Sequence, residues 1–173
     1  MLNKLKELDT ELLIFLNNLG NDSWDYIWLA ITDKYTFLPL FLLIIFLLYK
    51  ENGFYKLSII LLSISLLILF TDQFTNLIKD TFERLRPCRV EELQQFLRNI
   101  DVRCGKFGFF SAHAANSIAV TTLIITTFRF SYKKGISLLL IFWVAVFAYS
   151  RIYLGVHYPL DTFVGLCFGF IFG

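Results

Sequence analysis

Charged residues are scarce in this 173-residue chain, at 17% of the sequence, whereas 57% of the residues are hydrophobic. The charges are also unevenly placed, with long stretches nearly free of them and one segment rich in Arg and Lys. This hydrophobic fraction is far above that of ordinary soluble domains, which excludes water as the only solvent. The twenty Phe, eight Tyr and three Trp provide lipid-facing bulk and the amphipathic rings favoured at a membrane interface.

Several other features are missing from the sequence. The first apolar stretch is broken by Glu7, Asp9 and Glu11 and has no small-residue cleavage site, so we expect no cleavable signal peptide and no secretion. No cluster of Asp, Glu, His or Cys has metal-ligand spacing, so we expect a site without metal or other cofactor. There is no internal repeat and no low-complexity linker.

The three cysteines allow at most one internal disulfide. Cys88 and Cys104 lie in the same polar segment, whereas Cys167 lies in an apolar run. The possible disulfide is therefore between Cys88 and Cys104, with two free thiols as the alternative.

The apolar runs predict an all-α fold, a polytopic membrane helical bundle of about five spanning helices preceded by interfacial helices. The runs cover residues 35–49, 54–78, 112–128, 136–149 and 158–173. Several are shorter than the ~20 residues that cross a bilayer, so the polar residues at their ends should continue the helices. We expect residues 35–173 to form a transmembrane catalytic domain with an extramembrane loop at 79–110.

Residues 1–34 are expected to form N-terminal interfacial helices. Apolar residues recur at three- and four-residue spacing over 2–19, and charged residues occupy the other side. Asn21, Asp22 and Ser23 provide N-cap chemistry for a second, short helix that Asp33 and Lys34 interrupt. The alternative is a tilted first span, which would give six spanning helices, but its charges disfavour the hydrocarbon core.

If every apolar run crosses the membrane once, loop 79–110 and junction 150–157 lie on one membrane face. The first polar cluster on this face contains Lys79 and Arg86. The planar fork of an arginine and the mobile ammonium of a lysine suit a phosphoryl group. The alternative role for these cations is anchoring beside the membrane.

The second cluster, Ser111 and His113, lies where an apolar helix should begin. Free backbone N–H groups and the positive end of the helix dipole favour an anion there. Ser111 alone is explained by an N-cap role and His113 by a structural one. A titratable ring in the first turn of a membrane helix is costly, however, which favours a functional role.

The third cluster contains Arg151, His157 and Asp161. His157 and Asp161 are four residues apart, hence on one helical face if a helix begins here. A carboxylate bonded to one ring nitrogen leaves the other nitrogen as a base or nucleophile. The alternative is a structural ion pair, which does not explain why both histidines of the chain share a face with the cations.

In residue type, order and spacing, these three clusters resemble the signature motifs of the type 2 phosphatidic acid phosphatase (PAP2) superfamily. The resemblance covers the chain from about residue 35 onward and suggests a small bacterial membrane member. The family's middle motif usually reads Pro-Ser-Gly-His, whereas this chain has Phe110 and Ala112 around Ser111 and His113. Losing that glycine could narrow the approach of phosphate to the backbone.

The resemblance implies a catalytic role for each residue of the three clusters. His157 would attack phosphorus to form a phosphohistidine, Asp161 would support it, and His113 would protonate the leaving oxygen and then help activate water. The phosphate-binding residues would be Lys79, Arg86, Ser111 and Arg151. Phosphoryl transfer requires mainly positioning and charge stabilisation, which fixed cations can provide without a metal.

The expected substrate is a lipid phosphate, whose headgroup can reach a site at the end of membrane helices while its tail stays in hydrocarbon. Undecaprenyl diphosphate ranks first, followed by phosphatidylglycerol phosphate, phosphatidic acid or lipid A phosphate. Rival interpretations are a non-catalytic anion-binding channel or carrier and, less favoured, a haloperoxidase-like vanadate site. The lipid bilayer is the only other partner expected, with no nucleic acid and no protein partner implied.

The orientation signals conflict. The catalytic face carries more cations than the opposite turns, so the positive-inside rule would place it in the cytoplasm. The family resemblance and a Cys88–Cys104 pair favour an oxidising compartment. We expect a multi-pass protein of the inner membrane with its active site facing the periplasm or exterior.

Overall fold

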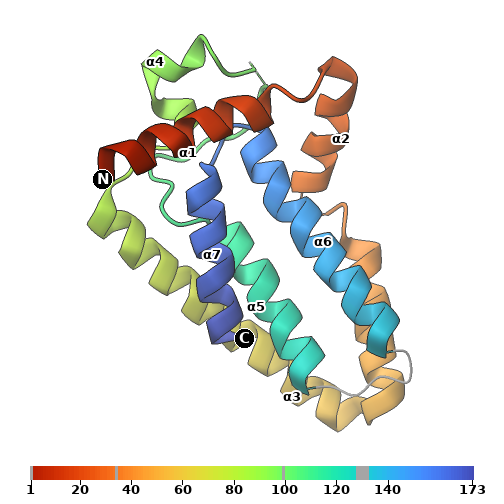
Figure 1. Cartoon of the computed structure of the whole chain (residues 1–173). Helices are drawn as coiled ribbons and strands as arrows, with labels where there is room; N and C mark the ends of the chain where they lie inside the picture. Colours follow the sequence, from red (N-terminus) through yellow and green to blue (C-terminus); the bar gives the residue numbers. More distant parts are fainter. Residues whose placement is uncertain (1, 34, 99, 128–132) are drawn as a thin grey trace.

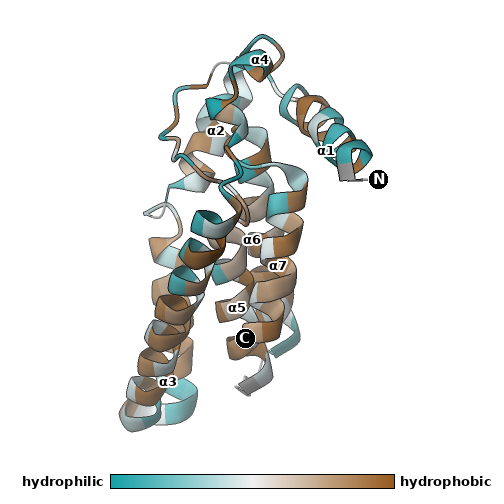
Figure 2. Ribbon diagram, turned by 90° about the vertical axis from the view of Figure 1, so that its left-hand side faces the viewer, coloured by the Kyte–Doolittle hydropathy of each residue, from teal (hydrophilic) through white to brown (hydrophobic). Residues whose placement is uncertain are grey.

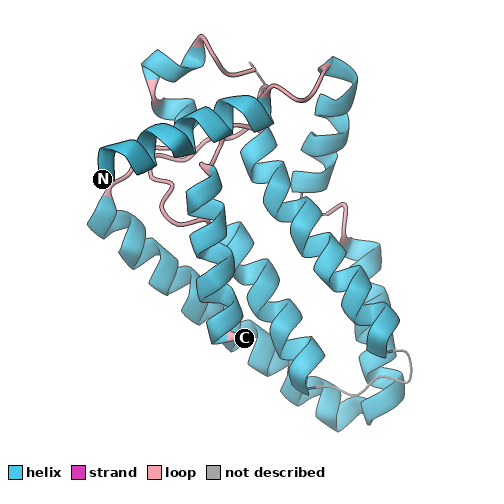
Figure 3. Cartoon of the chain, in the orientation of Figure 1, coloured by secondary structure: helices cyan, strands magenta, loops and turns pink. Residues whose placement is uncertain are grey.

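The computed structural model describes residues 2–33, 35–98, 100–127 and 133–173, and within these ranges the chain is helical without named strands (Figure 3). This confirms the predicted all-α class. The elements are α1 (Leu2–Asn17), α2 (Asp22–Thr32), α3 (Leu38–Phe82), a 3-10 turn (Pro87–Arg89), α4 (Glu91–Gln94), α5 (Ala112–Thr127), α6 (Lys133–Tyr153) and α7 (Pro159–Phe172).

Helix α3 is a hairpin rather than one straight rod. Gly53 leaves helical geometry at φ 75° and ψ 172°, and the chain reverses direction there (Figure 1). Because a positive φ is strained for residues with a Cβ, glycine suits this turn. The two apolar runs at 35–49 and 54–78 are its limbs, and they pack together through Ile44, Leu48 and Ile60.

The limbs of α3, with α5, α6 and α7, form a largely apolar bundle with polar residues at the end near α1 and α4 and at the turn of the α3 hairpin (Figure 2). Helices α3 and α6 are long and apolar enough to cross a membrane, while α5 and α7 are shorter apolar helices. Many large apolar side chains on these helices are exposed, as lipid contact requires. The number of spans stays a prediction.

Helices α5 and α7 pack with almost no space between their backbones. A Cβ added to Gly165 would lie 2.6 Å from the carbonyl oxygen of Ser111, and one added to Gly169 would lie 2.1 Å from that of Ala115. Small residues four apart on both helices allow this approach. The contact fixes the start of α5 against the start of α7, where the second and third polar clusters lie.

Helix α1 lies across the end of the bundle (Figure 1). Its inward side buries Asp9, Leu13 and Asn17, and the amide of Asn17 donates to the carbonyl oxygen of Tyr153 at 2.6 Å. The adjoining side of the helix leaves large apolar residues exposed, namely Leu5, Leu8, Leu12 and Phe15. This distribution is typical of a helix that lies on a bilayer surface.

Helix α2 begins as the sequence predicts. The side chain of Asn21 accepts hydrogen bonds from the backbone N–H groups of Ser23 and Trp24 at 3.1 and 3.2 Å. The helix ends at Thr32, next to the predicted interruption at Asp33. Lys34 lies outside the described residues.

Helix α3 ends one turn beyond the predicted apolar run, and the extramembrane placement of 79–110 stays a prediction. Helix α3 continues through Lys79 to Phe82, and Glu83 then adopts a left-handed conformation at φ 46° that ends it. The continuation follows the expectation that polar residues extend short apolar runs, but it places Lys79 on a helix rather than in the loop. The end of the predicted run at Phe128 lies outside the described residues.

The polar segment between α3 and α5 is held together at both ends. The backbone N–H of Arg86 donates to the carbonyl oxygen of Lys106 at 3.1 Å, and that of Gly108 donates to Arg84 at 2.8 Å. Cys88 and Cys104 form a disulfide with their Cα atoms 6.5 Å apart. The segment is thus a tethered cap over the end of the bundle.

Candidate active site

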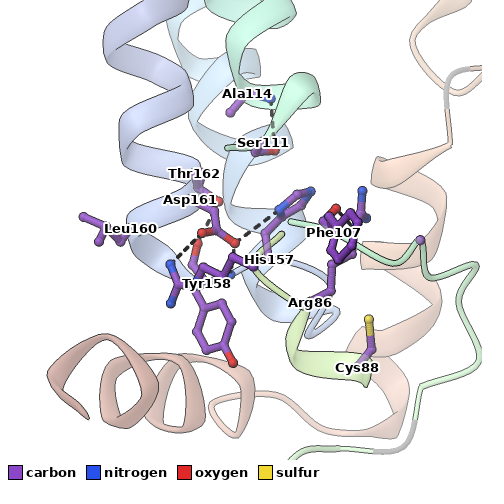
Figure 4. Close-up of polar contacts among 12 residues, drawn as sticks. Arg86, Cys88, Phe107, Ser111, Ala114, His157, Tyr158, Leu160, Asp161 and Thr162 are labelled. Carbon is purple, nitrogen blue, oxygen red and sulfur yellow. Dashed lines mark hydrogen bonds and ion pairs between the residues drawn. The ribbon is translucent and has the colours of Figure 1, made fainter. Parts of the chain in front are cut away.

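The three polar clusters converge beneath this cap, where Figure 4 shows His157 between Asp161 and the cap residues Arg86 and Phe107. The clusters come from α3 and the cap, from the start of α5, and from the junction of α6 and α7. Segments far apart in sequence therefore build one site at the covered end of the bundle.

His157 lies in the tight connection between α6 and α7, not on a helix. Gly155 turns the chain at φ 64°, and the backbone N–H of His157 donates to the carbonyl oxygen of Arg151 at 3.2 Å. Pro159 is the first residue of α7, so the condition for a shared helical face, a helix that already includes His157, is not met. Proline favours the first helical position because it needs no amide partner there.

His157 and Asp161 still face one another (Figure 4). The Nδ1 atom of His157 is 3.6 Å from Oδ2 of Asp161, and both side chains are fully buried. This separation is too long for a hydrogen bond. Oδ2 of Asp161 also accepts the backbone N–H of Tyr158 at 3.2 Å, as part of the N-terminal cap of α7.

The surroundings of His157 keep its ring neutral. Burial, followed by the positive charges of Arg86, Arg151 and Lys79, holds the pKa of His157 well below its usual value. Neither ring nitrogen has a hydrogen-bond partner within the described part of the chain. A neutral imidazole with a free lone pair and cations around it is suited to attack an electrophile that carries negative charge.

The cations reach the site from three elements. Lys79 comes from the last turn of α3, Arg86 from the cap and Arg151 from the last turn of α6. The guanidinium Nε of Arg86 donates to the carbonyl oxygen of Phe107 at 2.9 Å, and Arg151, which is buried, donates to the hydroxyl of Thr32. All three act electrostatically on His157, which brings together the predicted phosphate-binding cations.

Ser111 directly precedes α5 and is fully buried. Its hydroxyl accepts the backbone N–H of Ala114 at 3.4 Å, a long N-cap contact, and its own N–H donates to the carbonyl oxygen of Asp161 at 3.0 Å (Figure 4). Ser111 thus joins the start of α5 to the start of α7. A helix start is also a place where backbone N–H groups without a partner can meet phosphate oxygens.

The departures from the family's middle motif have a packing explanation at one position. That position is Phe110, where the family usually has Pro: its side chain is fully buried and stacks on Phe168 of α7, with ring centroids 5.1 Å apart. His113 lies in the first turn of α5, where the positive charges of Arg151, Arg86 and Lys79 act on its ring and His157 lies close enough to interact with it. Both predicted histidines therefore belong to the same site.

An apolar cavity of about 490 Å³ opens from His113 between α3, α5 and α6. Its walls include Ile45 and Leu48 near the turn of the α3 hairpin, and its few polar residues gather near His113. Among the latter, Asn116 donates to Asp72 at 2.7 Å. The cavity can take an apolar chain whose polar end reaches His113.

Sequence reasoning missed three residues of the site. Arg84 bonds to Asp161 at 2.7 Å, and Asp9 bonds to Arg84 at 2.7 Å. A Cβ on Gly108 would lie 2.9 Å from Asp161 and 3.6 Å from His157. The available signals were weak: Arg84 stands two residues before Arg86 in an extended stretch, and Asp9 borders the apolar stripe of its helix.

The described residues include no group of three or more His, Cys, Asp or Glu side chains placed to hold a metal ion. Metal independence stays a prediction, tested below.

Comparisons with known proteins agree on one family. A family model described as the PAP2 superfamily matches residues 56–173. A lipid A 4'-phosphatase from Bacteroides thetaiotaomicron is 36% identical over 173 residues, which cover 98% of this chain and 75% of the relative. A lipid A 4'-phosphatase from Porphyromonas gingivalis is 28% identical over 171 residues, which cover 96% and 70%.

Two crystal structures share the fold. One is a transmembrane PAP2 type phosphatidylglycerolphosphate phosphatase from Bacillus subtilis, with a TM-score of 0.75 and 20% identity over 98% of this chain and 83% of that one. The other is Aquifex aeolicus LpxE, with a TM-score of 0.70 and 22% identity over 94% and 90%.

Proposed function

The chain belongs to the PAP2 superfamily and is a membrane lipid phosphatase, and on this premise we propose that it removes phosphate from a lipid A-type substrate through a phosphohistidine on His157. The observation that carries the mechanism is the environment of His157, which is fully buried, held neutral and surrounded by three cations. Membership of a phosphatase family favours the enzyme over the anion channel or carrier.

In the first step, Nε2 of His157 attacks phosphorus, because Nδ1 is the nitrogen that faces Asp161. The nitrogen–phosphorus bond forms as the bond to the lipid oxygen breaks, and His113 donates a proton to that oxygen. Asp161 stabilises the positive charge that develops on the His157 ring. In the second step, water attacks phosphorus, His113 takes its proton, and phosphate leaves the ring.

The phosphoryl oxygens are held by Lys79, Arg86 and Arg151, with Ser111 and the start of α5 adding donors. Cations already fixed in place stabilise the equatorial oxygens without rearranging during the reaction. In this mechanism they carry the charge that a metal would otherwise carry.

The two lipid A 4'-phosphatases support lipid A phosphate as the first candidate substrate. The earlier ranking of undecaprenyl diphosphate above the other lipids finds no support in these relatives. The apolar cavity beside His113 supports any substrate whose tail enters from the hydrocarbon.

The bilayer placement is also a proposal. Residues 1–34 lie on the membrane surface, residues 35–173 form the catalytic domain, and the active site faces the periplasm or exterior of the inner membrane. The Cys88–Cys104 disulfide in the cap supports an oxidising compartment on that side.

A substrate panel tests the proposal. Purified protein is incubated in EDTA with lipid A, phosphatidylglycerol phosphate, phosphatidic acid and undecaprenyl diphosphate, and released phosphate is measured. We expect the highest kcat/KM with lipid A, with loss of the 4'-phosphate seen by mass spectrometry. Faster hydrolysis of another lipid would refute the substrate assignment, and no release from any would refute the function.

A further inference from the structure

We propose that Arg84 and Asp9 are positioning residues that orient the carboxylate of Asp161 toward the nucleophile. This inference rests on the proposed function, because it takes His157 as the nucleophile and Asp161 as its supporting acid.

The guanidinium of Arg84 bridges two buried carboxylates. Its Nη1 lies 2.7 Å from Oδ1 of Asp161 and its Nη2 lies 2.7 Å from Oδ2 of Asp9. The Asp161 and Asp9 side chains are only 0% and 4% exposed. The guanidinium carbon also lies 3.9 Å from the centre of the Tyr158 ring. A planar fork held on three sides can take few orientations.

Asp9 makes a second contact that reaches the same carboxylate. Its Oδ1 accepts the backbone N–H of Leu160 at 2.8 Å, one residue before Asp161. Burial raises the pKa of Asp9, and the bond to Arg84 opposes that rise. Asp9 therefore fixes both the guanidinium that binds Asp161 and the backbone that carries it.

These contacts assign different tasks to the two oxygens of Asp161. Arg84 occupies Oδ1, so Oδ2 is the oxygen that faces Nδ1 of His157. Without Arg84 the carboxylate could rotate away from the ring. Without the charge of Asp9, Arg84 would neutralise Asp161 more fully, and the carboxylate would stabilise a positive phosphohistidine less well.

The site also links catalysis to the surface helix. Asp9 lies on the inward side of α1 and borders the exposed leucines of the same helix. Arg84 is not one of the cations named above as acting on His157, and the carboxylate of Asp9 contacts Arg84 and the backbone of Leu160. Their loss should therefore lower kcat while leaving the binding of the phosphate group, and hence KM, nearly unchanged.

The first test is Asp9→Asn, in which the amide oxygen can still accept the N–H of Leu160 but the charge opposite Arg84 is gone. The matched control is Glu11→Gln, which removes one charge from an exposed position of the same helix. At a temperature below the melting transitions of all variants, kcat should fall about tenfold in Asp9→Asn, because the catalytic carboxylate is then less well placed. KM should stay within about twofold, and Glu11→Gln should match the wild type.

The second test is Arg84→Gln, measured by itself and combined with Asp9→Asn in a double-mutant cycle. The single Arg84→Gln variant tests the inference even if Asp9→Asn folds poorly. Arg84→Gln should show the same selective loss of kcat, and adding Asp9→Asn should cause no further loss, because Asp9 acts through Arg84. The inference would be overturned if the kcat losses of the two single variants multiplied in the double variant, or if Asp9→Asn kept the wild-type kcat. A rise of KM as large as the fall of kcat would also overturn it. None of these results would overturn the proposed function. A wild type inactive on every lipid phosphate would overturn the proposed function and this inference with it.

Discussion

Replacing Gly108 with alanine should damage catalysis through a single methyl group. The added Cβ would lie 2.9 Å from Oδ2 of Asp161, 3.2 Å from Cγ of Arg86 and 3.6 Å from Nδ1 of His157. To reach ordinary van der Waals contact, the carboxylate must move by about half an ångström. Arg84 and the N–H of Tyr158 hold that carboxylate, so the methyl group must distort the cap or the site.

The expected size of the effect follows from this displacement. A misplacement of about 1 Å can cost roughly 100-fold in rate, so we expect kcat/KM to fall about tenfold in Gly108→Ala. Overpacking should lower the free energy of unfolding by about 1–2 kcal/mol. Gly108 does not have a left-handed φ, so alanine adds no backbone strain there.

Gly105→Ala is the matched control, three residues earlier in the same cap. Its Cβ would lie 3.4 Å from the guanidinium of Arg86, which is ordinary contact and requires no displacement. Initial rates of phosphate release from a short-chain lipid phosphate and thermal unfolding should be measured for both variants. If Gly108→Ala keeps the wild-type kcat/KM, or if Gly105→Ala loses as much, the close packing around Asp161 does not govern the rate.

Three further predictions concern metal, the disulfide and pH. EDTA should leave activity intact and vanadate should inhibit, because trigonal-bipyramidal vanadate resembles the phosphoryl transition state; a need for added divalent metal would refute this. Mass spectrometry of protein isolated with thiols blocked should find Cys88 and Cys104 unalkylated, and replacing both with serine should cost about 3 kcal/mol for a loop of about 17 residues; two alkylated cysteines would contradict the bridge. Because the pKa of His157 is lowered in the folded state, the unfolded chain gains a proton that the folded chain does not, so stability should fall as pH drops below about 6.5. Thermal melts of His157→Gln should show a shallower fall over that range, and equal slopes would contradict the lowered pKa.

The convergence of the three polar clusters could be anticipated from sequence. Lys79, Arg86, His113 and His157 are residue types that membrane helices rarely carry without a function, and alternating spans place them on one face. The local turns were also readable, since Asn21 caps α2 as expected. Helix boundaries were less predictable, because polar residues after an apolar run can extend a helix, as Asp80 does in α3.

The residues that sequence reasoning missed depend on tertiary contacts. Arg84 has the same chemistry as Arg86, and only the position of Asp9, 75 residues away, distinguishes their tasks. Gly108 matters only because Asp161 packs against its backbone. Neither relationship has a local pattern. The substrate ranking lacked any residue-level basis, so the relatives rather than the motifs favour lipid A phosphate.

The most direct measurement of the central claim is to trap the covalent intermediate. Purified enzyme is mixed with a lipid phosphate labelled on its phosphate group, quenched in alkali within one turnover, and analysed by peptide mapping. Wild-type protein should carry labelled phosphate on His157, whereas folded His157→Ala should carry none and release no phosphate. Near-normal turnover in His157→Ala, or label on another residue, would contradict the account.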